Sequence, residues 1–419
     1  GVGGALAVDA GGAATAVLVG TAGGAKLVQR AGALASWGAA EPLPGRALGH
    51  AAGPVVAAAG AGAAVVAWRV DTPKKYGAIV ALARDPRSAA FGAPVVVSGS
   101  DPNGVRHPAV AVDGEGRALL AYNTDTRRTH LSLKGAIAVV VRRGAGRGFS
   151  APVVVDKTPA SPPAVALSAD GRGVVAWVRD RRIWAASIDA GAGRIGRPVA
   201  LTRAGSYRSV RVAAGPGGAA TVAFRTTVGS QRRPAIAALR RPAGGTLRGR
   251  KAQVLATAGP EEFIDTVALA ADEDGRATAA WSPERFDQDK TLGVNGVISG
   301  ISAASAEPSA QFGPVRVVAP PTTQWCSLPS LAASAGHTAL AWTCRDKKAF
   351  SIWSTRDLSP PTSILTGPAP TYYASNPTTV TTGLDTTTTT TLLITRPDPP
   401  TDTKAPTPPT ERVLTTTGR

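Results

Sequence analysis

Three stretches of the chain share one pattern of apolar and polar positions. They read PAVAVDGEGRALLAY at 108–122, PAVALSADGRGVVAW at 163–177 and VALAADEDGRATAAW at 267–281. In each, two short runs of Ala, Val and Leu flank a turn of Asp and Gly, which readily adopt the positive φ values of a tight turn. The pattern therefore predicts a β-hairpin. Because the runs are apolar at nearly every position rather than at alternate ones, both faces of each strand are expected to be buried.

The hairpin recurs seven times along the chain. Its second strand ends in an aromatic or apolar residue, and these ends follow one another at intervals of 47 to 61 residues. The ends are Val17, Trp68, Tyr122, Trp177, Phe224, Trp281 and Trp342. A phrase that returns at such a period indicates a repeat architecture. We expect each of these residues to be a wedge between neighbouring repeats.

Two further apolar phrases follow the hairpins. One is a continuous run, such as GAIVALA at 77–83 or GAIAVVV at 135–141. The other contains proline, as in FGAPVVV at 91–97, FSAPVVV at 149–155 and IGRPVAL at 195–201. Proline suits an edge strand, where one backbone donor can stay unpaired. One repeat is therefore predicted to hold four strands, of which the last is an edge strand.

Seven repeats of four antiparallel strands predict an all-β chain that folds as a seven-bladed β-propeller with a Thr/Pro-rich C-terminal extension. The propeller is expected over residues 1–366. Its repeats cover about 4–45, 52–98, 106–156, 161–202, 207–256, 264–319 and 327–366. The alternative all-β fold is a series of β-sandwich domains, which would need linkers between alternate repeats. No such linker occurs before residue 366.

With these repeats the chain resembles the secreted bacterial β-propeller repeat proteins, a group that includes WD-type and Asp-box propellers. The resemblance covers about residues 4–366. It departs from both motifs, because none of the four tryptophans that end a hairpin is followed by Asp. In SADGRGVVAW at 168–177, Ser and Asp have the Asp-box separation, but Gly and Trp come too late. These departures argue against a sialidase-like activity.

The composition changes how the strands are expected to pack. Apolar residues make up 43% of the 419 residues, and many are Ala and Val, so the core should gain stability from its extent rather than from bulky side chains. The net charge is +18 although only 18% of residues are charged. The chain starts with Gly and contains no Met, as expected of a product whose signal peptide has been removed. No apolar run is long enough to predict a membrane span.

The C-terminal part has a different composition. Residues 367–396 form a Thr-rich, β-prone extension, and residues 397–419 form a Pro/Thr-rich linker or tail. The stretch NPTTVTTGLDTTTTTTLLIT at 376–395 echoes the hairpin phrase. It could form an eighth hairpin, close the ring or reach another subunit.

The order of strands places the polar loops. If the first strand of each repeat starts at an upper face, the hairpin turns lie at the lower face. The loops between second and third strands then return to the upper face, where propeller ligands usually bind. Basic and aromatic residues in or next to these loops are the candidate binding residues: Lys74, Lys75, Tyr76, Arg127, Arg128, Arg179, Arg181 and Arg345.

Few patterns indicate catalysis. Glu284 with Asp287 or Asp289 is the acidic cluster expected at the upper face, where paired carboxylates could support glycoside hydrolysis, although a solvated loop accounts for it better. Asp272 and Asp274 are expected in a lower turn. They could bind calcium, but an Asp-Gly turn needs no metal to explain it.

The four histidines show no ligand spacing, so neither a metal site nor a cofactor is expected. They are His50, His107, His130 and His337. His107 precedes an inner strand and could face the central channel, although a structural or exposed role suits a lone histidine better. The chain has no P-loop, dinucleotide fingerprint or nucleophile elbow.

The densest basic region lies between residues 232 and 251 and contains no acidic residue. It consists of Arg232, Arg233, Arg240, Arg241, Arg248, Arg250 and Lys251. A solvated rim of the fifth blade explains it first, and contact with an anionic cell-wall polymer or an acidic partner second. Nucleic acid is not expected, because no aromatic residues are interleaved for base stacking.

Cys326 and Cys344 lie at the two ends of the seventh hairpin. We predict a disulfide between them, worth about 3 kcal/mol in the chain-entropy model. Disulfides persist in oxidising compartments, so the protein is expected to be secreted or at the cell surface.

These observations favour a non-enzymatic extracellular binding or assembly module. One form of it is a subunit of a surface structure or filament, with the C-terminal extension docked on a neighbour by strand addition. The alternative is a glycan-active hydrolase or lyase that uses the upper loops.

Overall fold

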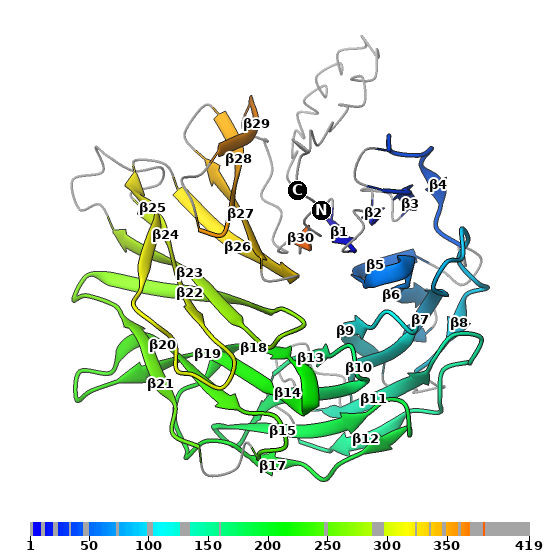
Figure 1. The fold of residues 1–419 in the computed structure, drawn as a ribbon, viewed down its shortest axis with the longest axis horizontal. Coiled ribbons are helices and arrows are strands. Elements are labelled where there is room, and N and C mark those ends of the chain that lie inside the picture. Colours follow the sequence, from blue (N-terminus) through cyan, green and yellow to red (C-terminus); the bar gives the residue numbers. More distant parts are fainter. Residues whose placement is uncertain are drawn as a thin grey trace, which may run out of the picture.

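The computed structural model arranges the chain as a ring of seven antiparallel sheets around a central axis (Figure 1). The residues it describes are 3–9, 13–19, 24–32, 35–44, 50–72, 75–98, 104–125, 135–158, 161–246, 250–286, 297–322, 325–334, 337–345, 349–358, 362–368 and 380–381. Each sheet is one blade, and its strands follow the chain from the centre outward. The predicted seven-bladed β-propeller is confirmed.

The strands of the first four blades have these bounds. Blade one contains β1 (Gly3–Val8), β2 (Ala14–Val19), β3 (Ala25–Arg30) and β4 (Glu41–Pro42). Blade two contains β5 (His50–Ala58), β6 (Ala64–Thr72), β7 (Lys75–Arg84) and β8 (Val95–Val96). Blade three contains β9 (Val105–Val112), β10 (Arg117–Asp125), β11 (Gly135–Arg143) and β12 (Val153–Asp156). Blade four contains β13 (Ala164–Leu167), β14 (Arg172–Arg179), β15 (Arg182–Asp189) and an outer strand divided into β16 (Arg194–Ile195) and β17 (Val199–Ala200).

The remaining blades follow the same order. Blade five contains β18 (Arg208–Ala214), β19 (Ala220–Val228), β20 (Arg233–Arg241) and β21 (Gln253–Thr257). Blade six contains β22 (Glu262–Ala271), β23 (Ala277–Phe286), β24 (Val297–Ala306) and β25 (Arg316–Thr322). Blade seven contains β26 (Trp325–Ser334), β27 (His337–Arg345), β28 (Ala349–Arg356) and β29 (Thr362–Pro368). The described residues also include two 3-10 turns, η2 (Gly60–Gly62) and η3 (Pro216–Gly218).

The polar turn of the hairpin phrase is closed by its own aspartate. In blade three, Oδ1 of the buried Asp113 accepts the N–H groups of Glu115 and Arg117, both at 3.0 Å. Asp272 does the same in blade six. Such side-chain bonds to the turn backbone fix the hairpin without a metal. Gly116 has a φ of 73°, which a residue with a side chain rarely adopts.

The wedge residues lie between blades, and six of them pack toward the preceding blade in the chain. Trp177 of blade four packs on Leu119 and Ile137 of blade three. Trp68, Tyr122, Phe224, Trp281 and Trp342 also pack on the preceding blade. All six are buried, so the predicted role of the aromatic ends is confirmed.

In blade one the wedge position is Leu18 and not Val17. The turn bond from Asp9 N–H to Ala13 O (2.9 Å) corresponds to the bond from Ala59 N–H to Ala63 O (2.9 Å) in blade two. Counting from these bonds makes Leu18 equivalent to Trp68. Val17 instead belongs to the cluster between blades one and two. Leu18 is 50% exposed, so the interface between blades seven and one has no buried wedge.

A short strand from the C-terminal extension lies at the inner edge of blade one. This strand, β30 (Val380–Thr381), pairs in parallel with β1, with Leu6 opposite Val380 and Ala7 opposite Thr381. It lies between β1 and β26, where the first and last blades meet (Figure 1). Of the three possibilities for the extension, the described residues therefore show a strand at the junction that closes the ring.

Arginines join the lower turns of neighbouring blades. Arg117 Nη2 of blade three donates to Ala169 O of blade four at 2.6 Å. A Cβ on Gly171 would lie only 2.8 Å from Arg117 Nε and would displace this guanidinium, and the φ of 78° also favours glycine there. In the same way, Arg142 of blade three pairs with Asp85 of blade two. Part of the high arginine content therefore has a structural role.

The predicted disulfide is confirmed. Cys326 on β26 and Cys344 on β27 are direct cross-strand partners with a Cα–Cα distance of 4.0 Å, and both are buried. Both lie within the strands rather than just outside the hairpin. No free cysteine remains. A disulfide is typical of a protein from an oxidising compartment.

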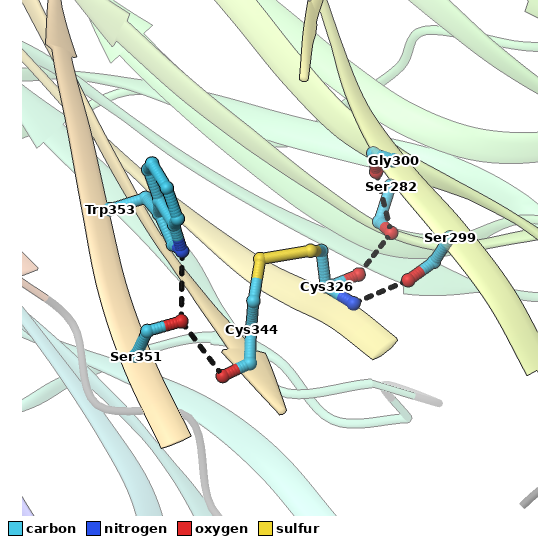
Figure 2. Close-up of a disulfide and its surroundings, with 7 residues drawn as sticks. All are labelled: Ser282, Ser299, Gly300, Cys326, Cys344, Ser351 and Trp353. Atoms are coloured by element: carbon cyan, nitrogen blue, oxygen red, sulfur yellow. Dashed lines mark hydrogen bonds between the residues drawn. A yellow bond between two sulfur atoms is a disulfide. The ribbon is translucent and has the colours of Figure 1, made fainter. Parts of the chain in front are cut away.

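Serines connect the disulfide to blade six (Figure 2). Ser282 Oγ lies 2.7 Å from Cys326 O and 3.1 Å from Gly300 O, and Ser299 Oγ accepts the Cys326 N–H. Ser282 and Ser299 are buried. The interface between blades six and seven therefore combines the Trp342 wedge with hydrogen bonds and a covalent link within the hairpin.

Candidate functional site

The inner strands are irregular near their upper ends, where the upper loops begin. Five of them, β5, β9, β18, β22 and β26, shift register against their second strand at corresponding places. Residues with positive φ occur at three of these bulges, namely Gly53 (54°), His107 (51°) and Ser209 (49°). A bulge bends the strand and redirects its side chains, and bulges are frequent beside binding sites. Positive φ is unfavourable for histidine and serine, so the surrounding structure must hold it.

His107 lies at the bulge of blade three, close to two arginines. The residue is accessible to solvent, while neighbouring groups cover part of its ring. This burial lowers the pKa of His107, and the charges of Arg106 and Arg69 lower the pKa further. The imidazole is therefore neutral at pH 7 and can accept a hydrogen bond or a proton.

A second basic group lies on blade five. Arg208 on β18 is directly opposite Arg225 on β19, a pairing of like charges that is unfavourable in a sheet. Arg211 is exposed, but burial by the surrounding protein lowers the pKa of its guanidinium. Its Nη1 donates a hydrogen bond to Val210 O at 3.1 Å.

We call these basic groups at the upper ends of the inner hairpins the upper mouth. It consists of Arg69, Arg106, His107, Arg208, Arg211 and Arg225. The inner strands that carry or adjoin them surround the axis of the ring (Figure 1). Glu262 of blade six also lies at this end, where its carboxylate accepts the Gly259 N–H at 2.8 Å. The upper mouth can hold an anion, because guanidinium groups donate several hydrogen bonds in a fixed plane.

Two of the candidate binding residues are described with their side chains. Arg179 has a structural role: Nη1 lies 3.1 Å from Asp156 Oδ1, and the guanidinium lies 3.5 Å from the centre of the Trp184 ring. Asp156 also accepts the indole N–H of Trp177. Arg181 is exposed in the tight turn between β14 and β15, where its φ is 58°.

The other candidate binding residues are placed only in part. Lys75 and Tyr76 belong to β7, and Arg345 belongs to β27, so these three lie on strands rather than in loops. Lys74, Arg127 and Arg128 lie outside the described residues. Among the described residues, the candidate binding residues therefore do not form one surface.

The acidic candidates differ from one another in their surroundings. Glu284 lies on β23, opposite Phe263 and Ser299, and is 8% exposed, where the sequence suggested a solvated loop. Asp287 and Asp289 lie outside the described residues. Within the described part of the chain, no group of three His, Cys, Asp or Glu side chains could hold a metal ion.

The basic region from 232 to 251 does not form one patch. Arg232 and Arg233 lie at the upper turn before β20, whereas Arg240 and Arg241 lie at its lower end. Arg240 Nη2 donates to Gly275 O of blade six at 2.9 Å. The predicted rim of blade five is thus divided between the two faces of the ring.

The sequence did not single out the arginines of the upper mouth, because each stands alone within an apolar strand. Their orientation depends on the bulges, which arise from strand pairing. A usable signal was their common place before the apolar run of the inner strand, as in VRHPAVAV at 105–112 and RSVRVAA at 208–214.

No family model and no curated protein matches the chain. Solved structures of similar fold include the polysaccharide lyase Uly1, with 12% identity and a TM-score of 0.43 over 74% of this chain and 80% of that one. The GH93 α-L-arabinofuranosidase of Fusarium graminearum has 10% identity and a TM-score of 0.41, over 73% and 88%. The NanB sialidase of Streptococcus pneumoniae has 8% identity and a TM-score of 0.41, over 80% of both chains. The propeller assignment rests on the seven sheets of the chain itself. Within the described residues, no helix has the length and apolar character needed to cross a membrane.

Proposed function

We propose that the protein is an extracellular binding module that captures an acidic polysaccharide at the upper mouth. The observation that supports this proposal is the set of six basic groups carried by the two innermost strands of blades two, three and five. Arg208 lies directly opposite Arg225, which brings two positive charges to neighbouring strands, and Arg211 on the same inner strand is exposed. A carboxylate or sulfate group can accept hydrogen bonds from guanidinium groups, so its binding is favoured. The disulfide supports the extracellular location.

The test is binding of polygalacturonate, with neutral dextran as the reference polymer. The variant Arg208→Glu/Arg211→Glu should weaken binding about tenfold or more, because two attractive charges become repulsive. Arg197→Glu is the matched control, since Arg197 is exposed on the outer part of blade four. Binding should also weaken as salt is raised. Equal affinity of wild type and the double variant, measured by isothermal calorimetry, would rule out the upper mouth.

A second candidate function is cleavage of an acidic polysaccharide by elimination, and His107 is the observation that favours it. A neutral imidazole beside two guanidinium groups suits this reaction. The arginines would neutralise a uronate carboxylate while His107 takes the proton from the carbon next to it. The electron pair of that C–H bond would form a C=C bond as the C–O bond to the leaving sugar breaks. The departing oxygen would take a proton from the His107 imidazolium or from water, which yields a hydroxyl group.

Product analysis separates binding, elimination and hydrolysis. Elimination yields new reducing ends together with an unsaturated uronate that absorbs ultraviolet light, and it should be lost in His107→Asn. Asn tolerates the positive φ at this position. Hydrolysis yields reducing ends without the unsaturated product, and Glu284→Gln is its control. If neither product is released from polygalacturonate, binding without cleavage is the function that the result supports.

Self-association through the C-terminal extension stays a prediction. The edge of β1 is occupied by β30 of the same chain. A filament built by strand addition would need this strand to be exchanged for that of a neighbouring copy.

A further inference from the structure

A cleft lies at the lower ends of blades five and six, and we call it the lower cleft. Its volume is about 310 Å³. Blade five contributes its hairpin turn and the chain that follows β20, and blade six contributes its own turn and residues 308–311. Because a hairpin turn lies at the opposite end from the start of the strand, the lower cleft and the upper mouth lie at opposite faces of the ring.

Arg240 forms the structural side of the lower cleft. Its guanidinium donates to Thr221 Oγ1 (3.3 Å), Glu307 O (2.6 Å), Gly275 O (2.9 Å) and Ala310 O. Three of these bonds connect blade five to blade six, and together the four occupy four of the five N–H donors of Arg240. Arg240 therefore shapes the cleft and leaves ligand binding to its neighbours.

Arg241 also lines the cleft, but its guanidinium is directed toward blade four. Its Nη1 donates to Ser187 Oγ at 2.6 Å, but its Nε is buried without a partner. Burial and the nearby Arg172 lower the pKa of Arg241. Arg172 Nη1 and Arg241 Nη2 both lie within 4.0 Å of the position that a Cβ on Gly218 would take, so the two guanidinium groups are neighbours on the blade-four side. Arg241 therefore adds positive charge near the cleft but leaves direct ligand contact to other residues.

Two exposed cations complete the basic side. Arg250 and Lys251 line the cleft, and Arg250 Nε donates a 3.3 Å hydrogen bond to Thr246 O. Asp274 and Ser309 line it from blade six. The cleft thus offers cations for an oxyanion and, on its other side, a carboxylate and a hydroxyl that can bond to sugar hydroxyls.

The lining also limits the class of ligand. It contains no aromatic side chain, so it has no platform on which a nucleic-acid base could stack. Its apolar members are Ala and Pro, which leave little surface for a lipid or an apolar peptide. A hydroxylated unit that bears a carboxylate or sulfate matches the remaining groups.

We propose that the lower cleft is a second binding site, which takes one oxyanion-bearing sugar unit of an acidic polysaccharide. This site stands independently of the upper mouth. If the proposed function also holds, each protein binds two polymer segments at opposite faces and links two chains together.

The experiment counts sites and measures linking in the full chain. Binding of polygalacturonate fragments and of dextran sulfate is followed by calorimetry, and linking of the long polymers by turbidity. Arg250→Glu/Lys251→Glu should remove one class of site, lower affinity there about tenfold or more, and abolish turbidity. Arg194→Glu/Arg197→Glu on blade four is the matched control and should change neither. The two polymers distinguish carboxylate from sulfate recognition.

A second variant tests whether binding requires the volume of the cleft and not only its positive charges. Ala243→Phe keeps every cation but fills the cleft beside Gly217, so it should also remove the second class of site. Unchanged stoichiometry and turbidity in Arg250→Glu/Lys251→Glu would overturn the proposal, as would full binding by Ala243→Phe. Loss of sites only in Arg208→Glu/Arg211→Glu would overturn the lower cleft while leaving the upper mouth in place. Loss of sites only in Arg250→Glu/Lys251→Glu would overturn the upper mouth while leaving the lower cleft in place.

Discussion

Six interfaces between blades differ from the seventh in how they are closed. In each of the six, a buried aromatic residue of one blade packs on the blade before it. Between blades seven and one the equivalent residue is the half-exposed Leu18. Among the described residues no hydrophobic cluster contains side chains from both of these blades, and β30 lies between them instead. The ring is thus held by side-chain packing at six places and by strand pairing at one.

The largest effect is expected from removing a buried wedge. Trp177→Ala leaves a cavity between blades three and four and removes the donor to Asp156. It should lower the free energy of unfolding by about 3–5 kcal/mol. Chemical denaturation of both proteins measures the difference. A loss below about 1 kcal/mol would show that the wedges do not hold the ring together.

The disulfide should have the next largest effect, because blade seven has a wedge on one side only. Cys326→Ala/Cys344→Ala should lower the free energy of unfolding by about 3 kcal/mol. Reduced wild type should match the double variant when both are denatured in the presence of a thiol reductant. If the reduced and oxidised proteins unfold at the same denaturant concentration, blade seven does not depend on its covalent link.

Removal of β30 tests the strand that occupies the seventh interface. A chain that ends at Pro368 should lose about 1–2 kcal/mol, since the pairing with β1 contributes few hydrogen bonds. Size-exclusion chromatography of the same variant tests the assembly hypothesis, with a chain that ends after Thr395 as the control. An oligomer formed by the control but not by the shorter chain would indicate that the strand also pairs between copies.

The smallest effect is expected at Leu18. Because Leu18 is half exposed, Leu18→Ala should change the free energy of unfolding by less than about 1 kcal/mol. It is the matched counterpart of Trp177→Ala at the equivalent position of another blade. A loss of several kcal/mol would mean that the seventh interface is packed like the others.

The sequence predicted the ring because its repeats follow simple physical rules. Apolar positions on both faces indicated strands between neighbouring sheets, and Trp177 or Trp281 marked each wedge. The same reasoning misplaced the wedge of blade one. In the apolar run ATAVLV at 14–19, no aromatic residue marks the position, so the alignment was one residue off.

The candidate site was harder to predict from the sequence. The upper mouth depends on bulges, and a bulge arises from the pairing of two strands rather than from either strand alone. The sequence also gave no means of separating structural arginines from free ones. Arg179 and Arg240 both hold neighbouring elements together, whereas Arg211 and Arg250 are exposed.

The common direction of the wedges has a consequence for biosynthesis. Each aromatic residue needs only the blade that precedes it in the chain, so a polypeptide that emerges with its N-terminus first can bury every wedge as soon as the corresponding blade forms. Growth proceeds by addition to an existing surface and needs no contact with segments still to be made. Until residues 380–381 have been synthesised, the inner edge of β1 remains without its partner strand.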